Sequence, residues 1–135
     1  MPKHRVTHGV LAVITNSGST NMPGSTLTIN HDGSGSLTYQ KRVHEQRFQR
    51  YVNRAFAPGT FESSQLANML AQIQDVSTIP HRNCVKSVSF GSTTTITYQG
   101  KTSGDLSCLS NEDAKIFLDV KDLVLQKIYP LVTRE

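Results

Sequence analysis

Both cysteines of this 135-residue chain bracket one short segment, Cys84 to Cys108, and this bracket constrains the fold more than any other sequence feature. Inside it, two runs alternate with the period of a β-strand, residues 87–90 and 93–99, and the second is rich in β-branched threonine. Gly91-Ser92 between the runs suits a tight hairpin turn, because glycine tolerates the positive φ that such a turn needs. The sequence therefore predicts a hairpin that returns Cys108 towards Cys84. Its predicted buried face consists of Val88, Phe90, Ile96 and Tyr98.

The two cysteines that bound this segment could be in either of two chemical states. A disulfide would close the loop and stabilise the fold by about 3 kcal/mol, and it would indicate an oxidising compartment. The alternative is a pair of buried free thiols, which behave as small apolar side chains. No Cys-x-x-Cys pair and no histidine at ligand spacing accompanies either cysteine, so no metal site and no cofactor are predicted. We predict the disulfide Cys84–Cys108.

The rest of the chain predicts strands before one helix and a second helix at the end. Alternation and turn residues indicate strands over residues 6–15, 25–30 and 36–40, with a hairpin turn at Asp32-Gly33. Apolar residues at helical spacing predict a helix over residues 61–76, capped by Ser63 or Ser64, and another from an N-cap at Ser110 to a stop at Pro130. The apolar stripes are Leu66, Met69, Leu70, Ile73 and Val76 in the first helix, and Ala114, Phe117, Val120, Val124 and Ile128 in the second.

The segment over residues 41–57 admits two interpretations. Its aromatic and apolar residues recur at the spacing of an amphipathic helix, and periodicity alone favours that helix. The alternative is a strand over residues 47–56, paired with residues 37–40.

Composition bounds the class of protein. The chain has the length of one domain, residues 1–135, of which residues 1–5 are predicted to be disordered. A net charge of +4 permits attraction to anions without demanding it. No run approaches the roughly 20 apolar residues of a membrane-spanning helix, so no transmembrane segment is predicted.

Three pieces of the chain resemble a family of small bacterial proteins of no assigned activity, many of them exported. They are Cys84-Val-Lys-Ser-Val-Ser-Phe-Gly, then Thr97-Tyr-Gln-Gly-Lys-Thr-Ser-Gly-Asp-Leu-Ser-Cys108, then the final amphipathic helix. The resemblance covers roughly residues 25–128 and is strong only over 84–108, and it departs at Gly104, where the family pattern has proline. It implies a secreted, periplasmic or cell-surface location and a strand rather than a helix over residues 47–56. It implies no function.

We therefore predict an α+β fold, with a mostly antiparallel sheet of about six strands and two helices on one face, in the order β-β-β-β-α-β-β-α.

Two groups of residues in the bracket are candidates for function. Thr93, Thr95 and Thr97 form a candidate ligand surface, a flat hydrogen-bonding face such as some carbohydrate- or ice-binding proteins use, although strand propensity explains them equally well. Asp105 is a candidate catalytic acid, but we predict that it caps backbone N–H groups in its loop. Lys86 and Ser87 are adjacent on a predicted strand, so their side chains point to opposite faces and cannot form a nucleophile–base pair.

A third candidate is a basic group with interleaved aromatic residues, which could hold a polyanion through phosphate contacts and stacking. The alternative is a charged edge strand that blocks aggregation. The basic group is Lys41, Arg42, Arg47, Arg50 and Arg54. Three functions follow as hypotheses. The leading one is an exported binding or inhibitor-like module without catalysis, whose partner the sequence does not identify beyond a protein or a polyanion as candidates. The others are a nucleic-acid or polyanion binder, and an enzyme whose site the sequence does not reveal.

Overall fold

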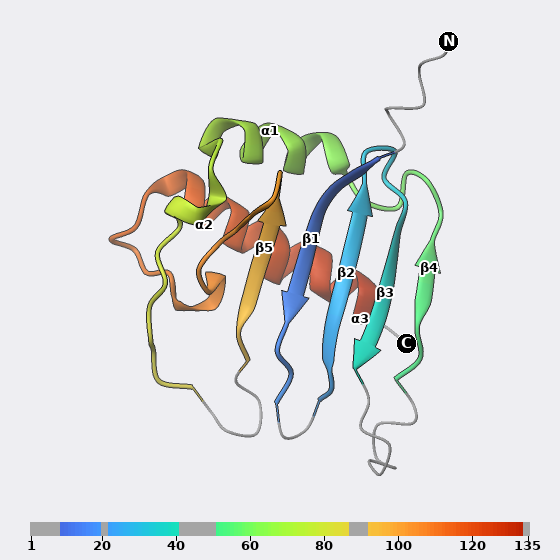
Figure 1. Ribbon diagram of the computed structural model, residues 1–135, viewed down its shortest axis with the longest axis horizontal. Helices are drawn as coiled ribbons and strands as arrows, with labels where there is room; N and C mark the ends of the chain where they lie inside the picture. Colours follow the sequence, from blue (N-terminus) through green and yellow to red (C-terminus); the bar gives the residue numbers. More distant parts are fainter. Residues whose placement is uncertain (1–8, 20–21, 41–50, 87–91, 134–135) are drawn as a thin grey trace.

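The structure is a computed structural model that describes residues 9–19, 22–40, 51–86 and 92–133. These residues form one antiparallel sheet of six strands in the order β4-β3-β2-β1-β5-β6 (Figure 1). The predicted fold class and the predicted order of elements are confirmed. The strands are β1 (Val10–Asn16), β2 (Gly24–Asn30), β3 (Gly35–Gln40), β4 (Arg54–Phe56), β5 (Thr94–Tyr98) and β6 (Lys101–Thr102).

The first three strands pair in sequence order as a meander, and the turn between β2 and β3 lies at Asp32-Gly33 as predicted. Gly33 has φ +84°, and a Cβ there would lie 2.8 Å from the Phe61 carbonyl oxygen. The Asp32 carboxylate accepts a hydrogen bond from the Ser34 amide at 2.9 Å and so closes the turn. Strand β1 lies inside the sheet, because it pairs with β2 on one side and with β5 on the other.

The hairpin in the cysteine bracket differs from the prediction. Strand β5 pairs with β6 through a turn at Gln99 and Gly100, which both have positive φ, as a two-residue type I′ turn requires. The first predicted arm, with Val88 and Phe90, lies outside the described residues. Ile96 is buried and Tyr98 packs half-buried against the core, as predicted.

Among the described residues of the segment before the first helix, the strand interpretation holds for Arg54–Phe56. Strand β4 pairs with Gly35–Leu37, at the opposite end of β3 from the predicted residues 37–40. We attribute this register to the Phe56 ring, which packs edge-on against Phe61 at 5.3 Å between centroids. Residues 51–53 are not strand, and residues 41–50 lie outside the described part.

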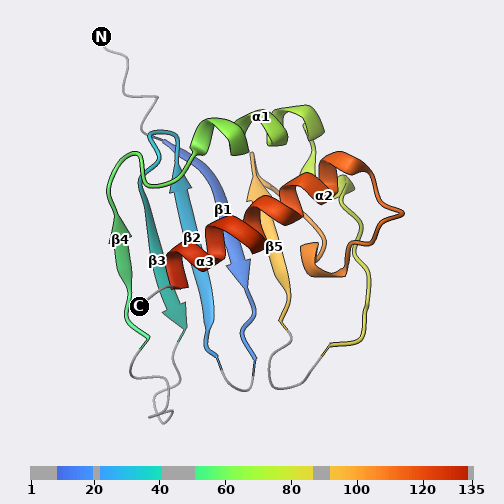
Figure 2. The same cartoon turned by 180° about the vertical axis from the view of Figure 1, so that it is seen from behind.

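Both helical segments pack on one face of the sheet (Figure 2). The first, α1 (Ser63–Ile73), is followed by the 3-10 turn η3 (Val76–Thr78). The predicted cap is wrong, because the Ser63 hydroxyl instead donates to the His31 carbonyl at 2.8 Å. A second 3-10 turn, η4 (Leu106–Cys108), precedes the final helix.

The final helix begins later and ends later than predicted. It is continuous through α2 (Lys115–Asp122), the π-helical turn η5 (Leu123–Ile128) and α3 (Tyr129–Thr133). Ser110 is not its N-cap, because the Asp113 carboxylate accepts from the Ser110 amide at 2.7 Å and forms a separate turn. Pro130 does not end the helix. We attribute this to the π turn just before it, since a widened turn accommodates a residue without an N–H group.

The core lies between the helices and one face of the sheet. Strand residues Ile14, Leu27, Leu37 and Ile96 are buried there against Leu70, Val120 and Val124 of the helices. Ile73 and Phe117, predicted to be buried with them, are only partly buried. The opposite face of the sheet carries no helix in the described part of the chain, and it faces the viewer in Figure 1.

Candidate functional site

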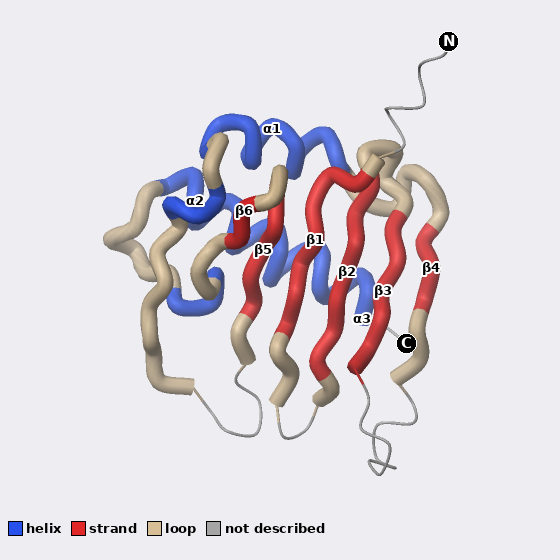
Figure 3. Tube along the Cα trace, viewed as in Figure 1, coloured by secondary structure: helices blue, strands red, loops and turns tan. Residues whose placement is uncertain are grey.

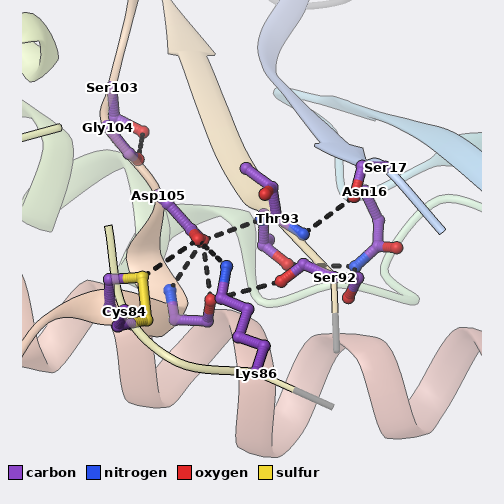
Figure 4. Close-up of polar contacts among 12 residues, drawn as sticks. Asn16, Ser17, Cys84, Lys86, Ser92, Thr93, Ser103, Gly104 and Asp105 are labelled. Carbon is purple, nitrogen blue, oxygen red and sulfur yellow. Dashed lines mark hydrogen bonds and ion pairs between the residues drawn. A yellow bond between two sulfur atoms is a disulfide. The ribbon is translucent and has the colours of Figure 1, made fainter. Parts of the chain in front are cut away.

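The Asp105 side chain joins the start of β5, the η4 turn and the chain at Lys86 (Figure 4). Its carboxylate accepts hydrogen bonds from the Thr94 amide at 2.9 Å and from the Ser107 amide at 3.0 Å, and it forms an ion pair with Lys86. Burial opposes ionisation, but Lys86, Thr94 and Ser107 together hold the pKa of Asp105 below its usual value. The predicted backbone-capping role is therefore confirmed.

Residues 81–86 form an exposed segment that leads to Asp105 and that we call the strap. It has no regular secondary structure and runs down one side of the molecule (Figure 3, left). The disulfide Cys84–Cys108, predicted from the sequence, ties it to η4 with 5.6 Å between the Cα atoms. Arg82 adds an ion pair with Asp113 at 2.6 Å.

Gly104 lets the chain before the strap approach closely. Its amide donates to the Ile79 carbonyl at 3.0 Å, and a Cβ at Gly104 would lie 1.9 Å from the Pro80 carbonyl oxygen. A residue with a side chain at this position would displace the segment that leads into the strap.

Within the strap, side chains alternate between the protein and the solvent. Cys84 is held by the disulfide and Lys86 by Asp105, while Val85 between them has a relative exposure of 102%. This alternation is that of an extended backbone. Among the described residues, no hydrogen bond engages a backbone amide or carbonyl of residues 81–86. The strap, which the disulfide and the Lys86–Asp105 ion pair hold in place, thus exposes Val85 together with backbone groups that make no hydrogen bond to the described residues.

Two clefts flank the strap. The first, of about 630 Å³, lies towards the final helix, and the second, of about 560 Å³, lies towards β5. Burial raises the pKa of Tyr129 in the first cleft to about 12, and the nearby Tyr39 adds to the rise. Tyr129 is therefore neutral at physiological pH. Besides the strap, the first cleft is lined by Met22, Ser25, Leu125, Tyr129 and Pro130, and the second by Thr93, Thr95, Asp105 and Cys108, among others.

The predicted threonine surface lies along β5 and the residue before it. Thr93 and Thr95 line the second cleft, and Thr95 and Thr97 lie on the uncovered face of the sheet. Thr94 between them is buried on the core side.

Of the predicted basic group, only Arg54 lies within the described residues. Its guanidinium donates to the Val132 carbonyl at 2.8 Å, at the end of α3, and lies 4.9 Å from the centre of the Phe56 ring. Arg54 therefore stabilises the carboxyl end of a helix, where cations are favoured. Lys41, Arg42, Arg47 and Arg50 lie outside the described part.

Sequence reasoning did not identify Val85 or Arg82 as site residues. A signal for Val85 was present, since it stands between a cysteine of the predicted disulfide and a lysine. The residues that the structure describes contain no cluster of three or more histidine, cysteine or acidic side chains suited to a metal ion. In the same residues, no helix combines the length and apolar character that crossing a membrane requires.

Comparisons with protein-family models, with curated proteins and with solved structures find no match to this chain. The fold and the site therefore define its class by themselves. It is an antiparallel α+β protein that presents an extended loop on a disulfide and two ion pairs.

Proposed function

We propose that this protein is an exported, non-catalytic binding module of the inhibitor-like kind, and that its strap docks into a groove of a partner protein. The observation that carries the proposal is the presentation of Val85 between two anchored neighbours, Cys84 and Lys86. A lone exposed valine is ordinary on a protein surface. Val85 differs, because the residues immediately before and after it are fixed, so its side chain is already held in position for contact with a partner.

Preorganisation favours binding because the loop loses little conformational entropy when it docks. The disulfide and the Arg82–Asp113 and Lys86–Asp105 ion pairs restrict the strap before any partner arrives. The disulfide also supports an oxidising compartment, in keeping with export.

The free backbone groups of the strap indicate the kind of groove. Grooves that bind extended segments pair with backbone amides and carbonyls and take alternate side chains in pockets. An endopeptidase binds its substrate in this way, and a peptidase with a small specificity pocket accepts a side chain of valine size. We therefore expect the partner to be an extracellular serine endopeptidase of that specificity.

The experiment titrates the protein into secreted serine endopeptidases with small, flat-apolar and acidic specificity pockets and measures hydrolysis of a chromogenic substrate. We expect inhibition of the small-pocket class and loss of inhibition in Val85→Asp. Val52→Asp is the matched control, because Val52 is also exposed, at 57%, and lies away from the strap.

Three outcomes would contradict the proposal. They are no inhibition of any class, equal inhibition by Val85→Asp, and inhibition that depends on Arg82 rather than on Val85. Rapid cleavage of the oxidised protein within the strap would show a substrate rather than an inhibitor.

A further inference from the structure

The uncovered face of the sheet carries a regular array of small side chains, which we call the threonine face. The register places Thr95, Thr15, Thr26 and Thr38 in one row across strands β5, β1, β2 and β3. A second row holds Thr97, Val13, Thr28 and Ser36 in the same strand order. The residues between them along the strands, such as Ile14 and Leu27, are buried in the core. The eight side chains therefore share the outer face.

The threonine face bears no charge, although the chain has 14 basic and 10 acidic residues. Protein surfaces ordinarily carry charged side chains on about a quarter to a third of their positions. Without cations the face is unsuited to nucleic acid or to an anionic membrane. It also lacks long side chains, and threonine and valine are stiff about χ1. The face is rigid and neutral.

Most hydroxyl groups of the array remain available. Thr97 pairs with Thr102 of β6 at 2.9 Å between the hydroxyl oxygens. Within the described part of the chain, no side-chain hydrogen bond engages the other six hydroxyls, those of Thr15, Thr26, Thr28, Ser36, Thr38 and Thr95. Within the described part of the chain, five of the six threonines therefore offer an unbonded hydroxyl beside a methyl group.

These groups repeat in two directions. Neighbouring strands lie about 4.8 Å apart, and alternate residues along a strand lie about 6.7 Å apart. A surface that matches the threonine face must be neutral and rigid, and it must repeat in two directions with spacings similar to these. An ice surface has these properties. A neutral crystalline polysaccharide repeats as well, but sugar rings stack on aromatic side chains, and none of the eight residues is aromatic.

We propose that the threonine face binds ice. Methyl groups order water in the gaps of the array, and the fixed hydroxyls join that water to the ice lattice. Neighbouring strands of a sheet are rotated by roughly 20–25°, so the array matches a lattice plane over a few strands only. The expected activity is therefore inhibition of ice recrystallisation, without a large depression of the freezing point. This proposal is independent of the strap.

The test anneals thin frozen films of the protein below the melting point and measures the mean ice-crystal size by microscopy. We expect several-fold smaller crystals than in buffer alone. In Thr15→Lys/Thr28→Lys, two long charged side chains break the array, and we expect crystals as large as in buffer. Gln72→Lys/Gln126→Lys adds the same charge on exposed helix positions, and it should act like the wild type.

Thermal unfolding of each variant checks that the fold is retained. If the double variant fails to fold, Thr38→Lys on the exposed position of β3 replaces it, with the same expected loss. Crystals of buffer size with the wild-type protein would overturn the proposal. So would full activity in the lysine variant, or retention on an insoluble neutral polysaccharide without any effect on ice.

Discussion

A single carboxylate, that of Asp105, stabilises the start of β5, the η4 turn and the strap at once. Thr94 lies 11 residues before Asp105 and Lys86 lies 19 residues before it, so each contact closes a loop. The side chains of Asp105 and Lys86 are 8% and 23% exposed, so the ion pair between them is largely shielded from solvent. Removing one partner of such a pair leaves the other charge without compensation.

We expect Asp105→Asn to lower the free energy of unfolding by about 3 kcal/mol, because it leaves Lys86 unpaired in a partly buried position. Urea denaturation measures the loss. Asp119→Asn is the control, since Asp119 pairs with the exposed Lys115 one helical turn away, and surface pairs of this kind contribute less than about 1 kcal/mol. Equal losses in the two variants would contradict the central role of Asp105.

The same carboxylate makes stability depend on pH in the acid range. Its folded-state pKa is below the unfolded value, so its contribution is complete above the unfolded pKa and is lost as pH falls through the folded pKa. The stability difference between wild type and Asp105→Asn should therefore stay constant from neutral pH to about pH 4 and shrink below it. Denaturation at pH 7, 5 and 3 tests this. A difference that already shrinks between pH 7 and pH 5 would mean that the pKa is raised instead.

At residue scale, the sequence predicted roles that depend on neighbours in the chain and missed those that depend on contacts across the fold. The backbone-capping role of Asp105 follows from its loop, and it was predicted. The need for glycine at position 104 was not predicted, because it comes from the Pro80 carbonyl, 24 residues earlier in the chain. Proline at position 104 would lack the amide that donates to Ile79 and would collide with Pro80.

At the scale of elements, the disulfide determines how far the strap can open. The double variant Cys84→Ser/Cys108→Ser should lose about 3 kcal/mol of stability, because the loop that the disulfide closes becomes free in the unfolded state. Trypsin should then cleave after Arg82 or Lys86 several-fold faster than in the oxidised protein. Mass spectrometry of timed digests locates the cuts. Unchanged cleavage of the strap would show that the ion pairs alone hold it.

Strand and helix positions were predictable where one face of the element is buried. Period-2 alternation located β2 and β3 because Leu27, Ile29 and Leu37 point into the core. The β5–β6 hairpin was not predicted, because its turn uses Gln99 at positive φ, which glutamine rarely adopts. The end of the final helix was missed for a related reason, since the π turn before Pro130 has no signature in the sequence.

At the scale of the whole molecule, a net charge of +4 is a mild excess that permits attraction to anions without requiring it. Arg54 is bound to the end of α3 rather than free for a phosphate. We expect binding to single-stranded DNA to be weak at physiological salt, and the triple variant Arg47→Gln/Arg50→Gln/Arg54→Gln to change it little. Fluorescence anisotropy over a range of salt concentrations measures this. A micromolar affinity that falls steeply with salt and disappears in the triple variant would instead establish the polyanion hypothesis.

The position of β1 has a consequence for the order of folding. Strands β1 to β4 pair in sequence order, so this part of the sheet can assemble as soon as residue 56 is available. The β5 partner of β1 begins only at residue 94. Until Thr97 is available to pair with Val13, one edge of β1 has no neighbouring strand. Two strands that are far apart in the sequence pair slowly, and an unpaired strand edge can pair with another chain in the meantime. During most of synthesis β1, which is an inner strand of the finished sheet, is therefore an edge strand. Its exposure to aggregation ends when β5 pairs with it.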